Sequence, residues 1–120
     1  MDFRDNKAIY LQIVDYVCEK ILQNEWLPNK KILSVRELAI ALEVNPNTVM
    51  RSYEFLTQED IIHTQRGIGY FVSINGVQRA IAFKKQEFEI NEIPLLHKTM
   101  QLLNISMSDL EDLLKKQAKK

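Results

Sequence analysis

The stretch SVRELAIALEVNPNTV, residues 34–49, carries the start signals of two helices with almost no linker between them. Ser34 can accept a hydrogen bond from the backbone N–H of Glu37, whose side chain can bond back to Ser34, which makes a capping box. Asn45 is a strong N-cap, and Pro46 suits the first helical position because the N–H that it lacks has no partner there. A linker this short requires a sharp turn, so the stretch predicts a helix-turn-helix.

Apolar patterns on both sides extend this motif into a domain. Residues 8–24 carry apolar side chains at helical spacing, which predicts a first helix packed on a core by Ile9, Ile13, Val14, Val17, Ile21 and Leu22. Residues 61–64 and 70–74 are rich in β-branched and aromatic residues and are joined by a glycine-containing turn, which predicts a β-hairpin. Asn75-Gly76 then punctuates the chain. The predicted fold is α+β, with a winged helix-turn-helix domain over residues 1–74 and a short α-helical region over residues 75–120.

The region after this boundary has an apolar repeat of its own. Apolar residues recur every seven positions at Ile81, Phe88, Leu95 and Leu102. Because the repeat persists across Pro94, one long kinked helix is favoured over a helix that ends at Ile93 and restarts. Asn104 is expected to end this helix, and Ser108 with Glu111 to cap a last one. The apolar stripe has no partner within the tail, which indicates dimerisation, with folding back onto the first domain as the alternative.

The residue inventory argues against an enzyme and against a membrane protein. Residues 1–5 lack the basic-then-apolar order of a secretory signal, no apolar run approaches a membrane span, and Cys18 has no partner for an intrachain disulfide, so a cytoplasmic protein is expected. His63 and His97 are far apart, and no metal-ligand spacing or nucleophile motif is present, so no catalytic, cofactor or metal site is predicted. Residues 67–69, Gly-Ile-Gly, precede a strand rather than a helix, unlike a phosphate-binding loop.

The charge balance does not by itself indicate a nucleic-acid partner. Residues 1–72 hold eight Lys and Arg against ten Asp and Glu, a net charge of −2, and residues 73–120 hold eight against six, a net charge of +2. A DNA-binding surface would therefore require basic side chains gathered on one face. This balance keeps open an alternative in which the winged helix binds another protein instead of DNA.

The predicted second helix of the helix-turn-helix begins with short polar side chains, where such a helix enters the major groove. Asn can contact adenine through two hydrogen bonds, Thr can touch a thymine methyl, and Arg51 can reach guanine or phosphate. Arg36, at the start of the preceding helix, can meet a backbone phosphate, and Arg66 with Gly67 forms a hairpin tip that can approach the minor groove. Each residue also has a simpler interpretation as a cap, turn or solvated loop residue. The candidate DNA-binding residues are Lys31 (with Lys30 beside it), Arg36, Asn45, Pro46, Asn47, Thr48, Arg51, Arg66 and Gly67.

Residues 9–72 resemble the DNA-binding domain of the GntR family of bacterial regulators. The resemblance rests on IYLQI at 9–13, LP at 27–28, LSVRELA at 33–39, LEVNPNTV at 42–49, YEFL at 53–56 and RGIGYFV at 66–72. It implies that Arg36 contacts phosphate, that Asn45, Asn47 and Thr48 face bases, and that Arg66 and Gly67 form the wing tip.

Four departures from the family pattern concern loops and base reading. Asn29 and Asp60 stand where the family usually has glycine, and Leu33 replaces the usual Pro before the Ser. The usual Ser-Arg at the start of the recognition helix is Asn45-Pro46 here. A familiar base-reading Arg is therefore missing, and the family's operator does not carry over.

The length of the tail indicates a subfamily. Most family members carry a large effector-binding domain, whereas only about 48 residues follow the wing here, too few to enclose a ligand pocket of the usual size. A short helical tail after an Asn-Pro-Asn-Thr recognition helix resembles the YtrA subfamily, in which the tail dimerises and the regulated genes often encode ABC transporters. The resemblance thus implies a homodimeric repressor of a palindromic operator with half-sites about one helical turn apart. It assigns no small-molecule effector.

Overall fold

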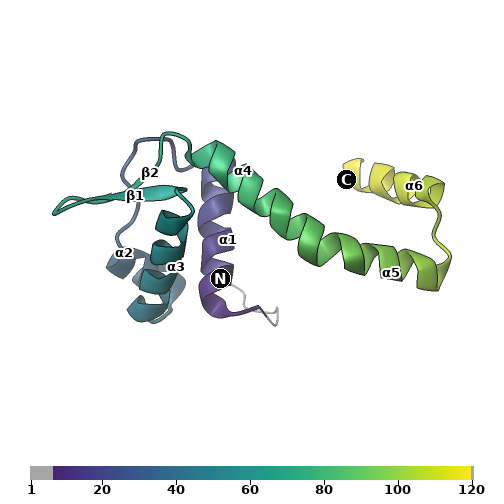
Figure 1. The fold of residues 1–120 in the computed structure, drawn as a ribbon, viewed down its shortest axis with the longest axis horizontal. Coiled ribbons are helices and arrows are strands. Elements are labelled where there is room, and N and C mark those ends of the chain that lie inside the picture. Colours follow the sequence, from purple (N-terminus) through teal and green to yellow (C-terminus); the bar gives the residue numbers. More distant parts are fainter. Residues whose placement is uncertain (1–6, 120) are drawn as a thin grey trace. The chain divides into compact units, whose positions relative to one another are not determined.

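The computed structural model describes residues 7–119, so the N-terminal residues considered above for a signal lie outside it. The chain forms two compact units that divide between Phe83 and Lys84. In chain order the elements are α1 (Ile9–Leu22), α2 (Val35–Leu42), α3 (Pro46–Gln58), β1 (Ile62–Gln65), β2 (Gly69–Val72), α4 (Gly76–Glu87), the π-helical turn η1 (Phe88–Glu92), α5 (Ile93–Leu103) and α6 (Met107–Ala118) (Figure 1). The predicted α+β class, a winged helix followed by a helical region, is confirmed.

The core of the first unit is built by α1, α2 and α3 together with the hairpin. Its largest fully buried side chains are Ile13, Val14, Val17, Cys18, Ile21, Leu38, Val49, Tyr53, Leu56, Ile61, Ile62 and Val72. The prediction for Ile9 is wrong, because this side chain is 46% exposed and the buried stripe of α1 begins one turn later. The buried Tyr53 hydroxyl donates a 2.6 Å hydrogen bond to the Leu33 carbonyl, and burial raises the pKa of this hydroxyl.

Both predicted caps of the helix-turn-helix are confirmed. The Glu37 N–H donates to Ser34 Oγ at 3.1 Å, and the Ser34 N–H donates to Glu37 Oε1 at 2.9 Å. The Asn47 N–H donates to Asn45 Oδ1 at 2.8 Å. Between the two helices Glu43 adopts a left-handed conformation with φ 56°, which ends α2 and lets the chain turn into α3.

The wing is a two-stranded antiparallel hairpin with a third segment alongside. Ile62 lies opposite Val72 in the β1–β2 register. On the other edge of β2, the Ile32 N–H donates to the Tyr70 carbonyl at 3.0 Å, and the Val72 N–H donates to the Lys30 carbonyl at 3.1 Å. The loop that precedes α2 is therefore held against the wing.

Two residues that stand where the family usually has glycine adopt a backbone conformation typical of glycine. Asn29 has φ 62° and Asp60 has φ 58°, both in the left-handed region. Asn and Asp enter this region more readily than other residues with a Cβ because their short polar side chains can bond locally. At these two positions the chain therefore takes a backbone conformation that glycine favours.

The first turns of α4 belong to the core of the first unit. A Cβ on the buried Gly76 would lie 2.7 Å from Val72 Cγ1 and 2.8 Å from the Ile61 carbonyl oxygen, so only glycine fits there. Ala80 is buried, and the Phe83 ring packs edge-on against Phe55 with 5.4 Å between ring centroids. The compact unit therefore ends at Phe83 rather than at the predicted boundary at residue 74, because packing continues past the hairpin.

The helix that leaves the first unit runs through Pro94 without a break. Glu87 and Ile93, at the two ends of η1, both have right-handed helical backbone angles. Pro94 lacks the N–H of a regular turn and its ring crowds the preceding turn, and the wider π-helical turn lies directly before it. One extra residue in that turn rotates everything beyond it by about 100°. Phe88 and Leu95 therefore do not share one straight heptad stripe.

The α5–α6 connection ends one helix and starts the next within three residues. Asn104 has φ 54° and ends α5 as predicted. The Ile105 N–H then donates to the Met100 carbonyl at 2.9 Å, which closes the last turn of α5.

The predicted cap of the last helix is wrong. Ser106, not Ser108, is the N-cap, and Asp109, not Glu111, completes the capping box with hydrogen bonds of 3.0 Å in both directions. Both pairs fit the Ser-x-x-acidic pattern, so the pattern alone did not distinguish them. The earlier pair forms because α5 is already closed at residue 105, which leaves the next residue available as a cap. Along residues 7–119, no helix combines the length and the apolar character needed to cross a membrane.

Candidate nucleic-acid interface

The exposed face of α3 is defined by what the opposite face buries. Val49, Ser52, Tyr53 and Leu56 face the core, and the side chains of Asn47, Arg51 and Glu54 are exposed. Residues three or four apart share a helix face, so Asn47 and Arg51 lie one above the other. The Glu54 carboxylate would repel phosphate. The part of α3 that is electrostatically suited to DNA is therefore confined to its first two turns.

The first turn of α3 presents one fully available amide side chain. Asn45 already uses its Oδ1 as the helix cap, and Pro46 holds the first helical position. Asn47 is exposed, and its side chain takes no part in the cap. Thr48 is half-buried beside it. Of these residues, Asn47 has the geometry that is best suited to a two-bond contact with adenine.

Arg51 is stacked on an aromatic ring from α1. Its guanidinium carbon lies 3.8 Å from the centroid of the Tyr10 ring. Together with Asn47 and Thr48, these two residues and the start of α1 line a hollow of about 330 Å³. Sequence reasoning missed Tyr10. The available signal was an aromatic residue off the core stripe of the first helix, inside the stretch that carries the family resemblance.

The wing tip combines an exposed cation with an open backbone. Arg66 and Gly67 are both exposed, and Gly67 has φ 77° with no atom within 4 Å of the position that a Cβ would take. A Cβ on Gly69 would lie 3.0 Å from Lys31 Cε, so the Lys31 stem crosses the wing at that point. The structure thus places the Lys31 side chain beside the wing.

The wing is joined to the recognition helix through aromatic contacts that the sequence did not reveal. The Tyr70 ring meets Tyr53 of α3 edge-on, with 4.7 Å between centroids. The Tyr70 hydroxyl also lies 3.7 Å from the sulfur of Met50. These contacts hold the orientation of the hairpin relative to α3.

Arg36 projects from the first turn of α2, next to the capping box, and is exposed. The structure therefore brings Asn47, Thr48 and Arg51 together at one hollow, and sets Arg36 apart on the preceding helix. Within residues 7–119, no group of three or more His, Cys, Asp and Glu side chains could hold a metal ion. The chemistry that this surface offers is hydrogen bonding and positive charge.

A winged helix with exposed amides and cations on its second helix-turn-helix element is the architecture typical of a DNA-binding regulator. The sequence pattern described as "Bacterial regulatory proteins, gntR family" matches residues 9–72, more than half of the chain. The chain belongs to the GntR family, whose members are DNA-binding transcription regulators and not enzymes.

Similar proteins of known sequence or structure support this family membership. Over 71 residues the chain is 44% identical to the HTH-type transcriptional regulator YhcF of Bacillus subtilis, with 59% of each chain covered. Over 75 residues it is 43% identical to the HTH-type transcriptional repressor YtrA of the same organism, with 62% of this chain and 58% of YtrA covered. The matches thus span less than two thirds of these relatives. A solved GntR family regulator from Listeria monocytogenes is 34% identical, with a TM-score of 0.79 over 95% of this chain and 98% of the other.

Proposed function

We propose that this chain acts as a homodimeric transcriptional repressor that binds a palindromic operator. The observation that carries the proposal is the hollow at the start of α3, where Asn47, Thr48 and Arg51 meet on an exposed helix face. The similarity to the repressor YtrA supports repression rather than activation. Transporter genes as targets are what the resemblance to the YtrA subfamily implies, and a protein that binds the chromosome of a bacterium acts in its cytoplasm.

Each candidate residue has a role that follows from its place. Asn47 and Thr48 read base edges in the major groove, and Asn45 and Pro46 shape the turn that presents them. Arg51 contacts DNA one turn further along α3. Cations outside α3 contact the backbone: Arg36 from the first turn of α2, Lys31 beside the wing, and Arg66 at its tip, where Gly67 lets the chain approach the minor groove.

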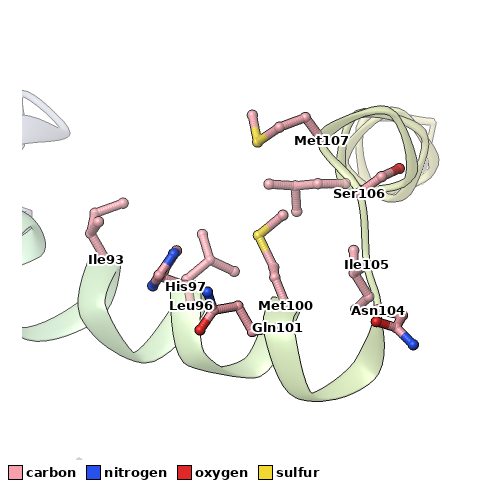
Figure 2. A pocket seen from close by; sticks show the side chains of 10 residues that line it. Ile93, Leu96, His97, Met100, Gln101, Asn104, Ile105, Ser106 and Met107 are labelled. Carbon is pink, nitrogen blue, oxygen red and sulfur yellow. The ribbon is translucent and has the colours of Figure 1, made fainter.

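Dimerisation through the tail is supported by its uncovered apolar side chains. Ile81 and Phe88 are 40% and 41% exposed, and Leu95 and Leu102 are 64% and 73% exposed. Between α5 and α6 lies a further apolar groove of about 670 Å³, into which Leu96, Met100 and Met107 point (Figure 2). A soluble chain seldom leaves apolar surface of this extent in water. A second copy would cover it and would present two recognition helices to the two half-sites of a palindrome.

Selection of bound sequences from a random DNA pool, with the full chain as bait, tests the function. The expected product is an inverted repeat. Arg36→Ala should then weaken binding to the selected site and to random DNA alike, by about 1–3 kcal/mol, and should shallow the salt dependence. Asn47→Ala should instead weaken the selected site by about 1–3 kcal/mol more than random DNA. A pool without any enriched sequence would contradict the proposal.

A further inference from the structure

The side chain of Arg51 is already positioned by the Tyr10 ring in the DNA-free protein. Its guanidinium carbon lies over the Tyr10 ring, 3.8 Å from the ring centroid. Among the described residues it forms no ion pair with a carboxylate. Stacking uses the face of the guanidinium, whereas its five N–H donors lie in its plane and stay available. A long side chain that is already oriented loses less rotational freedom when it binds.

The ring that supports Arg51 is itself tied to α3. Ser52, fully buried and next to Arg51 in sequence, donates a 2.7 Å hydrogen bond from Oγ to the Tyr10 carbonyl. The same Oγ lies 3.1 Å from the Thr48 carbonyl. Moving the Tyr10 backbone away from α3 would leave this buried hydroxyl without its long-range partner, which is costly. The stack is therefore supported by a second contact between the same two helices.

The position of Arg51 on α3 determines which part of DNA it can meet. Asn47, Thr48 and Arg51 line the hollow beside the start of α1, and the buried Ser52 is bonded to the Tyr10 carbonyl of that helix. The stack on Tyr10 draws the guanidinium toward the α1 side. A group at this edge of a helix in the major groove meets the wall of the groove, which is phosphate backbone, rather than base edges on its floor.

We propose that Tyr10 is a positioning residue that holds Arg51 against the DNA backbone on the α1 side of the recognition helix. The inference rests on the proposed DNA-binding function and adds a residue to it. Tyr10 acts through its ring face, so a phenyl ring should serve as well as a phenol. An aliphatic side chain of similar reach should not.

A double-mutant cycle tests the proposal on the full chain. Tyr10→Leu should weaken binding to the selected site and to random DNA alike, by about two- to fivefold, the size of an exposed cation–π contact. Tyr10→Phe should retain the affinity of the unmodified chain. In an Arg51→Ala background, Tyr10→Leu should have no further effect, which separates positioning of Arg51 from any general weakening of the fold.

Three results would overturn the inference: no loss for Tyr10→Leu, an equal loss in the Arg51→Ala background, or a loss confined to the selected site. In each case the unmodified chain still binds its selected DNA, so the proposed function stands. Absence of DNA binding by the unmodified chain would instead contradict the function itself. Thermal unfolding of each variant, followed by Trp26 fluorescence, identifies any variant that has lost its fold.

Discussion

The two compact units differ in how far they bury their own apolar side chains. Every buried apolar residue of the described chain lies between Ile13 and Ala80, in the first unit. The second unit, from Lys84 on, forms regular helices, with a capping box at the start of α6, but has no buried residue in η1, α5 or α6. Local signals were thus sufficient to form its helices, whereas stable packing of their apolar faces requires a surface from elsewhere. The first unit has a buried core of its own, whereas η1, α5 and α6 of the second unit are helical but bury no side chain.

The same truncation in each unit tests this contrast most strongly. Leu56→Ala removes a fully buried side chain and should lower the free energy of unfolding of the first unit by about 2–5 kcal/mol. Leu102→Ala, at a side chain that is 73% exposed, should change it by less than about 0.5 kcal/mol. Trp26, the single tryptophan, packs against the core of the first unit and reports its denaturant unfolding. Equal shifts of this transition for both variants would break the comparison.

Charging the tail should separate assembly from folding. Phe88→Glu places a carboxylate in the proposed dimer surface and should yield monomers by sedimentation, while the Trp26 transition is retained. Affinity for the selected operator should fall about 100-fold or more, because two linked half-sites bind far more tightly than one. Gln86→Glu adds the same charge two residues away at an exposed polar position and serves as the control. If the unmodified chain sediments as a monomer at tens of micromolar, the proposed dimer is wrong. The prediction of a palindromic operator then fails as well.

Gly76→Ala tests whether the first unit includes the start of α4. The added Cβ would meet Val72 Cγ1 at 2.7 Å and the Ile61 carbonyl at 2.8 Å, so the start of α4 must shift. The Trp26 transition should lose about 1–3 kcal/mol, as for other overpacked sites. Gln78→Ala, on the same helix but exposed, should have little effect. If Gly76→Ala proves neutral, the first turns of α4 do not contribute to the core as described.

Acidification should produce the smallest effect, and it tests both units in the same way, because α2 and α6 each begin with a capping box. Hydrogen bonds, led by the Ser34 backbone N–H, lower the pKa of Glu37, and the Ser106 backbone N–H does the same for Asp109. A carboxyl group with a lowered folded pKa contributes stability above its unfolded pKa and loses it as pH falls through the folded pKa. Both caps should therefore weaken below the ordinary carboxyl range.

NMR titration of the Glu37 and Asp109 amides should follow this loss, with Glu37→Gln and Asp109→Asn as non-titrating controls. The first turn of α6 should fray before that of α2, because only α2 is also held by buried side chains. Titration of both amides at ordinary carboxyl pKa values would contradict the role of the caps.

The features that could be predicted from sequence are those that depend on near neighbours in the chain. Ser34 and Glu37 find each other across one turn, Asn45 caps a helix that Pro46 begins, and Asn104 ends another. The hairpin and the apolar face of α3 follow from residue preference and periodicity in the same way. These signals are strong because the interacting groups are only a few residues apart, so few alternatives compete.

Only the tertiary structure decided where packing stops and which side chains meet across the fold. Periodicity placed Ile9 in the core, but its side chain is 46% exposed, and packing of Phe83 on Phe55 carries the first unit past residue 74. The Tyr10–Arg51 stack joins residues that are distant in sequence, and no local pattern contains that information. The sequence by itself determined the helices, the caps of the helix-turn-helix and the family. The core boundary and the pairing of Tyr10 with Arg51 required three-dimensional packing, because they depend on contacts that form only once the helices have come together.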